Sequence, residues 1–310
     1  MLKILRSYDM LLLMSLEIYC PQNPLSQYVH MFWAWDNYCP IHSKERILPH
    51  GSIELNINLS ERDFSIENHA IDKVLVAGAR SNHFVIDTSH ETSLLSVWFK
   101  AGAGRLFFDI PANELNNSHI PLNFLWGEFA NDFYYQLLCA PTTQMRFKII
   151  ERTLLQRLQI SKQRPQIVDY AVQCLNYAPQ AQTIKHIVDK IALSPTQFIH
   201  VFKEHVGLTP KVYSRVNRFQ FALHQIASQS QATLVGHHGT SQIMSAEKPV
   251  SEREDPLIKK VNWADIALSS GYYDQSHLIN EFRAFAGITP SDYAPQDPEH
   301  LSNIPYFDET

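Results

Sequence analysis

The chain has 310 residues, of which 45% are hydrophobic and 18% are charged. This balance excludes a wholly disordered chain, and 10 glycines with 17 prolines exclude collagen-like and glycine-rich low-complexity proteins. The formal net charge is −5, yet residues 164–228 hold seven Lys and Arg against three Asp and Glu. This basic segment is a weak sign of a polyanionic partner and needs a motif to support it.

The N-terminal apolar run, Met10–Leu16, is too short to span a bilayer. Glu17 follows it closely and no small-x-small cleavage site comes next, so we expect no signal peptide and a cytoplasmic location. Four cysteines are scattered without a C-x-x-C pair and are expected to be reduced: Cys20, Cys39, Cys139 and Cys174.

The first half of the chain alternates short apolar runs with turn signals. Residues 52–59 alternate strictly between polar and apolar, which predicts a half-buried strand, and residues 74–77, 83–87 and 94–99 are similar. Frequent short strands favour an antiparallel sandwich or barrel. From about Phe124 the apolar residues recur at helical spacing, which predicts two amphipathic helices closing an α+β domain over residues 17–160.

A polar segment that ends in proline, residues 161–165, is a predicted linker. Beyond it the pattern is helical over residues 166–295, except in residues 228–260. That segment has no sustained periodicity and is rich in charged residues, so we expect a solvated, disordered insertion there.

The strongest signal is an internal repeat in the second half. Residues 187–210 are echoed by residues 266–290, and each copy predicts a short helix, a tight turn and a second helix. Gly207 and Gly287 are placed as C-caps, and Ser194 with Pro195 forms an N-cap and first-turn pair. A helix from Lys211 to about Ile226 joins the copies. Two helix-turn-helix units can read successive major grooves, whereas the competing hypothesis is a helical bundle whose repeat serves packing alone.

These motifs resemble the AraC/XylS family of bacterial transcription regulators. The resemblance covers about residues 166–293 and rests on residues 207–213, 218–220, 271–277 and 287–293. The first half is similar to an uncharacterised regulatory domain, through residues 48–51, 99–104 and 110–115. The resemblance implies an N-terminal sensor or dimerisation domain, strand-rich and cupin-like, before an all-α domain of two helix-turn-helix units. It also implies a homodimer on promoter DNA, a small-molecule effector and RNA polymerase as a further partner.

Carried over by position, the family's DNA-contacting face falls on the second helix of each unit, with three cations on the connecting helix. The residues so implied are Thr196, Gln197, Ile199, His200, Lys203, Lys211, Arg215, Arg218, Gln275, Ser276, Ile279, Asn280 and Arg283. Gln and Asn can bond adenine edges, Ile can pack on thymine methyls, and Lys and Arg can reach phosphates or guanine. The alternative for each polar residue is a solvated helix face.

The chain also departs from the family pattern. Family members often carry Arg at the positions of His200 and Asn280, and Ala192 replaces the usual turn glycine. The insertion precedes the second unit, and residues 229–310 together hold five Lys and Arg against twelve Asp and Glu. We therefore expect the first unit to dominate DNA affinity.

Aromatic residues of the first domain are candidates for an apolar effector pocket, although each could equally be ordinary core: Trp33, Trp35, Trp98, Phe99 and Phe108. A third hypothesis is that this domain only dimerises the protein through its closing helices.

A cupin-like metal-dependent enzyme, with the helical domain as a protein-interaction module, is the competing function. Its ligands would come from His83 with His90 or His42 with His50, and from Glu54 or Glu91. No H-x-H or H-x-x-x-H spacing supports them, so we expect no catalytic residue, no metal and no cofactor.

Overall fold

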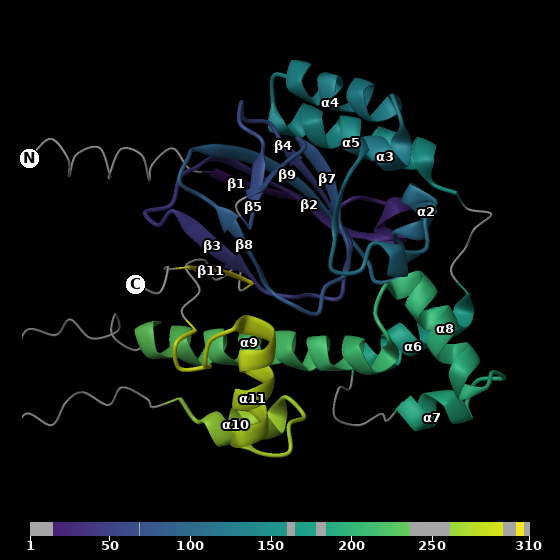
Figure 1. The fold of residues 1–310 in the computed structure, drawn as a ribbon, viewed down its shortest axis with the longest axis vertical. Helices are drawn as coiled ribbons and strands as arrows, with labels where there is room; N and C mark the ends of the chain where they lie inside the picture. The colour runs from purple at the N-terminus through teal and green to yellow at the C-terminus, as the bar shows by residue number, and fades with distance from the viewer. Residues whose placement is uncertain are drawn as a thin grey trace, which may run out of the picture.

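The computed structural model describes residues 15–67, 69–159, 165–177, 184–235, 261–293 and 302–306. The first half is strand-rich and the second half is helical (Figure 1), which confirms the predicted fold class. The strands are β1 (Ser15–Tyr19), β2 (Val29–Tyr38), β3 (Lys44–Ile47), β4 (Glu54–Asn58), β5 (Phe64–Ile66), β6 (His69–Ile71), β7 (Val74–Ala77), β8 (Phe84–Asp87), β9 (Thr92–Phe99), β10 (His119–Pro121) and β11 (Asn303–Pro305).

Two antiparallel sheets face each other. One has the strand order β1-β2-β9-β4-β7-β10, and the other has the order β11-β3-β8-β5-β6. Because successive side chains of a strand point to opposite faces, the larger sheet has two different surfaces. On its outer face Leu55, Ile57, Leu95 and Val97 are buried in the main core of this half. The inner face looks toward the second sheet.

Short helices cover the outer face of the larger sheet (Figure 1). They include α3 (Asn123–Trp126), α4 (Phe129–Cys139) and α5 (Thr143–Arg157). The other helices of this half are η1 (Leu25–Gln27), α2 (Arg105–Phe108) and η2 (Ala112–Glu114). Phe133, Leu137, Ile150 and Leu154 are at most 1% exposed and lie in the same core as the sheet. The two closing helices predicted from the helical spacing of apolar residues are therefore present as α4 and α5.

The second half contains α6 (Gln166–Tyr177), α7 (Ile184–Asp189), α8 (Pro195–Val206), α9 (Pro210–Val235), α10 (Trp263–Ser269) and α11 (Gln275–Ala286). Each predicted helix-turn-helix is present, as α7 with α8 and as α10 with α11. Gly207 and Gly287 end α8 and α11 with φ of 92° and 69°, the left-handed conformation that favours glycine. Among the described residues no helix has both the length and the apolar character to cross a bilayer.

Two features differ from the sequence prediction: the length of the connecting helix and a strand near the C-terminus. The connecting helix α9 continues to Val235, so the start of the segment 228–260 is helical rather than disordered, while residues 236–260 lie outside the described residues. The chain also returns to the first half, because β11 pairs antiparallel with β3 (Asn303 with Ile47). A strand of three residues is too short to show periodicity, which is why the sequence did not reveal it.

The helical half is packed against the strand-rich half. An ion pair joins Arg105 of α2 to Glu204 of α8, and Nδ1 of His83 contacts the carbonyl oxygen of Phe285 at 3.0 Å. The long helix α9 crosses the open end between the two sheets (Figure 1). There the amide of Gln220 donates to the carbonyl of Pro49 at 2.7 Å. Both helix-turn-helix units therefore contact the first half.

Candidate nucleic-acid interface and cavity

The first helix-turn-helix unit presents a polar face. Phe198 and Phe202 are fully buried, while Val201 is half-buried, and together they hold α8 in the core. The predicted contact residues of α8 all lie on its exposed side: Thr196, Gln197, Ile199, His200 and Lys203. The second helix of this unit is therefore amphipathic, with one face packed in the core and a polar face exposed.

The side chain of Gln197 was predicted to contact adenine, but in the structure it binds Ser194. Its Oε1 accepts hydrogen bonds from the backbone N–H of Ser194 at 3.0 Å and from Oγ of Ser194 at 2.9 Å. Oγ of Ser194 in turn accepts from the backbone N–H of Gln197. This capping box occupies the amide oxygen that a bidentate adenine contact would need. Gln197 therefore stabilises the start of α8, and the spacing S-x-x-Q could have indicated this.

The second unit has the same organisation. Oδ1 of Asp274 accepts from the backbone N–H of His277 at 2.7 Å and caps α11, while Leu278 and Phe282 are fully buried. Four of the predicted contact residues are exposed and one, Ile279, is half-buried; the exposed ones are Gln275, Ser276, Asn280 and Arg283. The two units thus offer equivalent faces.

Arg215 and Arg218 of α9 are not phosphate clamps in this structure. Nε and Nη2 of Arg215 each donate to Glu281 of α11 at 2.8 Å, and its guanidinium lies 5.1 Å from the Phe285 ring centre. Burial opposes ionisation of Glu281, but the hydrogen bond and charge of Arg215 outweigh it and lower the pKa of the carboxyl group. Arg218 donates to the carbonyl of Gly271 at 3.2 Å. Both side chains hold the second unit on α9.

Lys211 remains exposed at the start of α9. We expect Lys211→Ala to reduce the slope of log affinity against log salt by about 0.9, the value for one lost phosphate contact. Arg215→Ala should leave that slope unchanged and lower the free energy of unfolding by about 1–2 kcal/mol, because it breaks charge-assisted hydrogen bonds. Fluorescence anisotropy with DNA over a salt series and chemical unfolding measure the two effects. Equal loss of slope in both variants would contradict the assignment.

A cavity of about 300 Å³ lies between the two sheets. Its walls are mostly apolar and include Trp33 and Trp98 of the predicted effector residues. The second half contributes Gln220 and His224 from α9, and Ser302 and Asn303 from the C-terminal segment. The remaining lining residues are Met31, Ile47, His50, Glu54, Asn56, Phe64, Ile66, Leu75, Phe84, Ile86, Leu94 and His119.

The other three predicted effector residues lie elsewhere. Trp35 lines a neighbouring cavity of about 230 Å³. Phe99 and Phe108 are 0% and 2% exposed in the core under the helices, with ring centres 5.3 Å apart. Phe99 follows Trp98 on β9 and so points to the opposite face of the sheet. The prediction that these two phenylalanines line the pocket is wrong.

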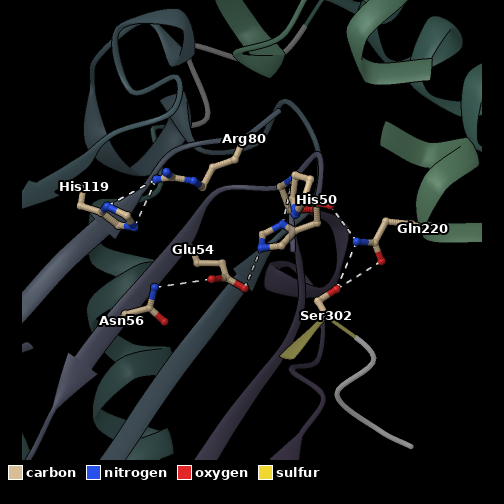
Figure 2. Close-up of polar contacts among 9 residues, drawn as sticks. His50, Glu54, Asn56, Arg80, His119, Gln220 and Ser302 are labelled. Atoms are coloured by element: carbon tan, nitrogen blue, oxygen red, sulfur yellow. Dashed lines mark hydrogen bonds and ion pairs between the residues drawn. The ribbon is translucent and has the colours of Figure 1, made fainter. Parts of the chain in front are cut away.

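The polar groups of the cavity were missed by sequence reasoning, although strand alternation carried a signal. Glu54 and Asn56 alternate with the buried Leu55 and Ile57, which places them on the inner face. Figure 2 shows Glu54 between its two partners: Nε2 of His50 lies 3.3 Å from Oε1, and Nδ2 of Asn56 lies 3.5 Å from Oε2. At the right of Figure 2, Nε2 of Gln220 donates to Oγ of Ser302 at 3.1 Å.

The pKa values of two histidines of the wall are lowered, which favours the neutral form. Burial, followed by the charge of Arg80, lowers the pKa of His119 to about 3. Partial burial also lowers the pKa of His224. Arg80 points to His119, with Nη1 at 3.3 Å from Nε2, as Figure 2 shows, and its guanidinium lies 4.3 Å from the Phe84 ring centre.

The histidines nominated as metal ligands are dispersed. His42 pairs with Glu45 at 2.7 Å, His50 pairs with Glu54, and His83 contacts the backbone of Phe285. His90 contacts Arg62, and Glu91 is exposed. In the described part of the chain no three His, Cys, Asp or Glu side chains gather where they could hold a metal ion.

Comparison with known families finds two matches. Residues 254–293 match the bacterial regulatory helix-turn-helix proteins of the AraC family, and residues 17–121 match a domain of unknown function, DUF6597. The first match covers α10 and α11. The equivalent α7–α8 unit is related to it through the internal repeat. A search of curated proteins found no match.

Among solved structures, the chain is similar to ToxT from Vibrio cholerae. For ToxT of strain O395 the identity is 11% and the TM-score 0.36, over 91% of this chain and 96% of that one. For ToxT of strain SCE256 bound to an unsaturated fatty acid the values are 10% and 0.37, over 91% and 94%. Likeness at this level assigns neither ligand nor mechanism to the present chain.

Proposed function

We propose that this chain, which carries a C-terminal helix-turn-helix domain of the AraC family, is a sequence-specific DNA-binding transcription regulator controlled by a small molecule. The observation that carries the proposal is the family match of residues 254–293 together with the exposed polar faces of α8 and α11. Each face belongs to a packed, capped second helix of a helix-turn-helix unit, the element that enters the major groove in such proteins.

The exposed residues of these two faces differ in the part of the DNA that they can contact. His200 and Asn280 have groups that can bond base edges, while Lys203 and Arg283 can contact phosphates or guanine. Ile199 is 43% exposed, and an exposed apolar side chain on such a face suits contact with a thymine methyl. Lys211 adds a phosphate contact at the start of α9.

Control by a small molecule is proposed because the cavity has walls from both halves of the chain. Gln220 and His224 belong to α9, the helix that carries Arg215 and Arg218 toward the second unit. A ligand in the cavity therefore contacts the helix on which the second unit is held. Such a ligand can change DNA affinity only as far as it binds the DNA-competent arrangement more tightly, or less tightly, than the alternative.

As parts of the same proposal, the protein acts in the cytoplasm as a homodimer on promoter DNA and meets RNA polymerase there. Exposed apolar side chains on α4 and α5 support dimerisation through the closing helices. They are Tyr135, Leu138, Met145 and Leu155, with exposed fractions between 43% and 68%. Catalysis forms no part of the proposal.

Selection from random duplex DNA by the full-length chain, at two salt concentrations, tests the proposal. We expect an enriched motif that is lost in the double variant His200→Ala, Asn280→Ala and kept in His69→Ala, whose exposed side chain lies on β6. Lys203→Ala should weaken binding more than Arg283→Ala if the first unit dominates. Absence of enrichment with the full-length chain would overturn the DNA-binding function, and equal losses would overturn the order of the two units.

A further inference from the structure

On the inner face of the larger sheet, three residues of adjacent strands lie directly beside one another. Strand register pairs Glu54 of β4 with Trp98 of β9 on one side and with Ala77 of β7 on the other. Directly paired residues of antiparallel strands have Cβ atoms about 4.5–5.5 Å apart. The Glu54 carboxylate and the Trp98 indole therefore share one part of the cavity wall, and the small Ala77 lies next to Glu54 on the neighbouring strand.

The Glu54 carboxylate has unused hydrogen-bonding capacity. Its side chain is 14% exposed, and its contacts among the described residues are His50 at 3.3 Å and Asn56 at 3.5 Å. Both distances exceed the roughly 2.7–2.9 Å of a strong charge-assisted hydrogen bond. An ionised carboxylate can accept about four hydrogen bonds, so donors from a ligand can bind it without displacing these neighbours.

Among the described residues that line the cavity, none is a lysine or an arginine that could bind an anionic ligand. His119 and His224 are held toward the neutral form, and Arg80, which is not among the lining residues, contacts His119 and the Phe84 ring. A ligand carboxylate would find no cation among the described lining residues to bind directly, and it would face the charge of Glu54. Both effects weaken its binding.

The aromatic residues of the wall suit a cation. The rings of Trp33 and Trp98 line the cavity, and a tryptophan face attracts an ammonium group within about 6 Å of its centre. The Trp98 ring packs against the His50 ring at a tilt of 47°, with ring centres 5.4 Å apart, which holds its indole beside Glu54. Phe64, Phe84 and Leu75 supply the apolar remainder of the wall.

We propose that the effector is a protonated amine with an aromatic or aliphatic body, its ammonium group held between the Glu54 carboxylate and the Trp98 ring. The side-chain oxygen of Asn56 accepts a further hydrogen bond from the ammonium, and the body of the ligand fills the apolar space toward Phe64 and Phe84. This proposal rests on the proposed function, because it names the ligand class of the same cavity.

The test uses the full-length chain and three probes that share one ring system: 2-(1-naphthyl)ethylamine, 2-(1-naphthyl)ethanol and 1-naphthylacetic acid. Isothermal titration at neutral pH should rank the amine at least about tenfold tighter than the alcohol, with the acid weakest. Glu54→Gln keeps the shape of the side chain and removes its charge. It should reduce amine affinity by about tenfold or more and leave alcohol affinity within about threefold.

Glu61→Gln, at an exposed glutamate outside the cavity wall, is the matched control and should leave all three affinities unchanged. Tighter binding of the acid, an amine preference that survives Glu54→Gln, or absence of amine binding would overturn the proposal. The DNA selection and the amine titration test different claims, so their results are combined as follows. Loss of DNA enrichment with Glu54-dependent amine binding would refute the regulator and leave an amine-binding protein, whereas DNA enrichment with acid preference would refute only the ligand class.

Discussion

Phe282→Ala is expected to lower the free energy of unfolding by about 3–5 kcal/mol, the cost of removing a buried phenylalanine ring. Phe282 of α11 is fully buried, and its ring centre lies 5.1 Å from that of Phe219 and 5.7 Å from that of Tyr293. These contacts join α11 to α9 and to the segment after Gly287. Loss of the ring therefore loosens the whole second unit, and DNA affinity should fall with stability.

Phe221→Ala is the matched control for Phe282→Ala. Phe221 belongs to α9 as Phe219 does, but it is 38% exposed, so removing its ring leaves little cavity. We expect a loss of about 1 kcal/mol or less for this variant. Chemical unfolding followed by circular dichroism measures both. Similar losses in the two variants would contradict the packing of α11 against α9.

The half-buried His119 is expected to make the protein sensitive to acid. Its pKa is about 3 in the folded chain and about 6.5 in the unfolded chain, because burial and Arg80 disfavour the imidazolium. The unfolded state therefore binds the proton more tightly. The contribution of His119 is complete above pH 6.5 and is lost as the pH falls from 6.5 toward 3, at about 1.4 kcal/mol per pH unit.

His119→Gln removes the titrating group from the cavity wall. Between pH 6.5 and about pH 4.5, the fall in unfolding free energy should be smaller in this variant than in the native chain by about 2 kcal/mol. His69→Gln, at an exposed histidine of β6, is the control and should keep the native pH dependence. Unfolding by denaturant over a pH series gives the comparison. Identical pH slopes in the native chain and His119→Gln would show that His119 is not held neutral.

Much of the fold could be predicted from periodicity. Alternation over residues 52–59 gave a strand, and its phase placed Leu55 and Ile57 in the core. Spacing of three and four residues gave the closing helices, and the repeat gave both helix-turn-helix units. These features are local, so a short window of sequence contains the information that decides them.

The errors concern contacts between distant parts of the chain. Arg215 reads as a free cation on an exposed helix, yet its partner Glu281 lies 66 positions away and is brought to it only by the packing of α11 on α9. Gln220 and His224 are four residues apart and so share a face of α9, but the sequence does not say that this face meets a cavity. The position of β11 depends on pairing with β3 across the fold.

Among the candidate effector residues, too, local alternation predicts some positions, whereas others depend on contacts between distant residues. Trp33 and Trp35 lie two positions apart on β2 and share its inner face, as alternation requires. The same rule places Phe99 on the opposite face of β9 from Trp98, so its position outside the cavity could have been predicted. Phe108 could not, because its helix α2 carries no alternating pattern and its burial depends on the rings of Phe99 and Trp126.

The measurement that tests the account most directly is the affinity of the full-length chain for its selected DNA site with and without a cavity ligand. We would use 2-(1-naphthyl)ethylamine at a concentration that saturates the cavity, as judged by titration of the same preparation. Coupling between the cavity and the DNA-binding faces through α9 predicts a change in DNA affinity of at least about fivefold. An affinity that stays the same while the cavity is saturated would contradict control of DNA binding from this site.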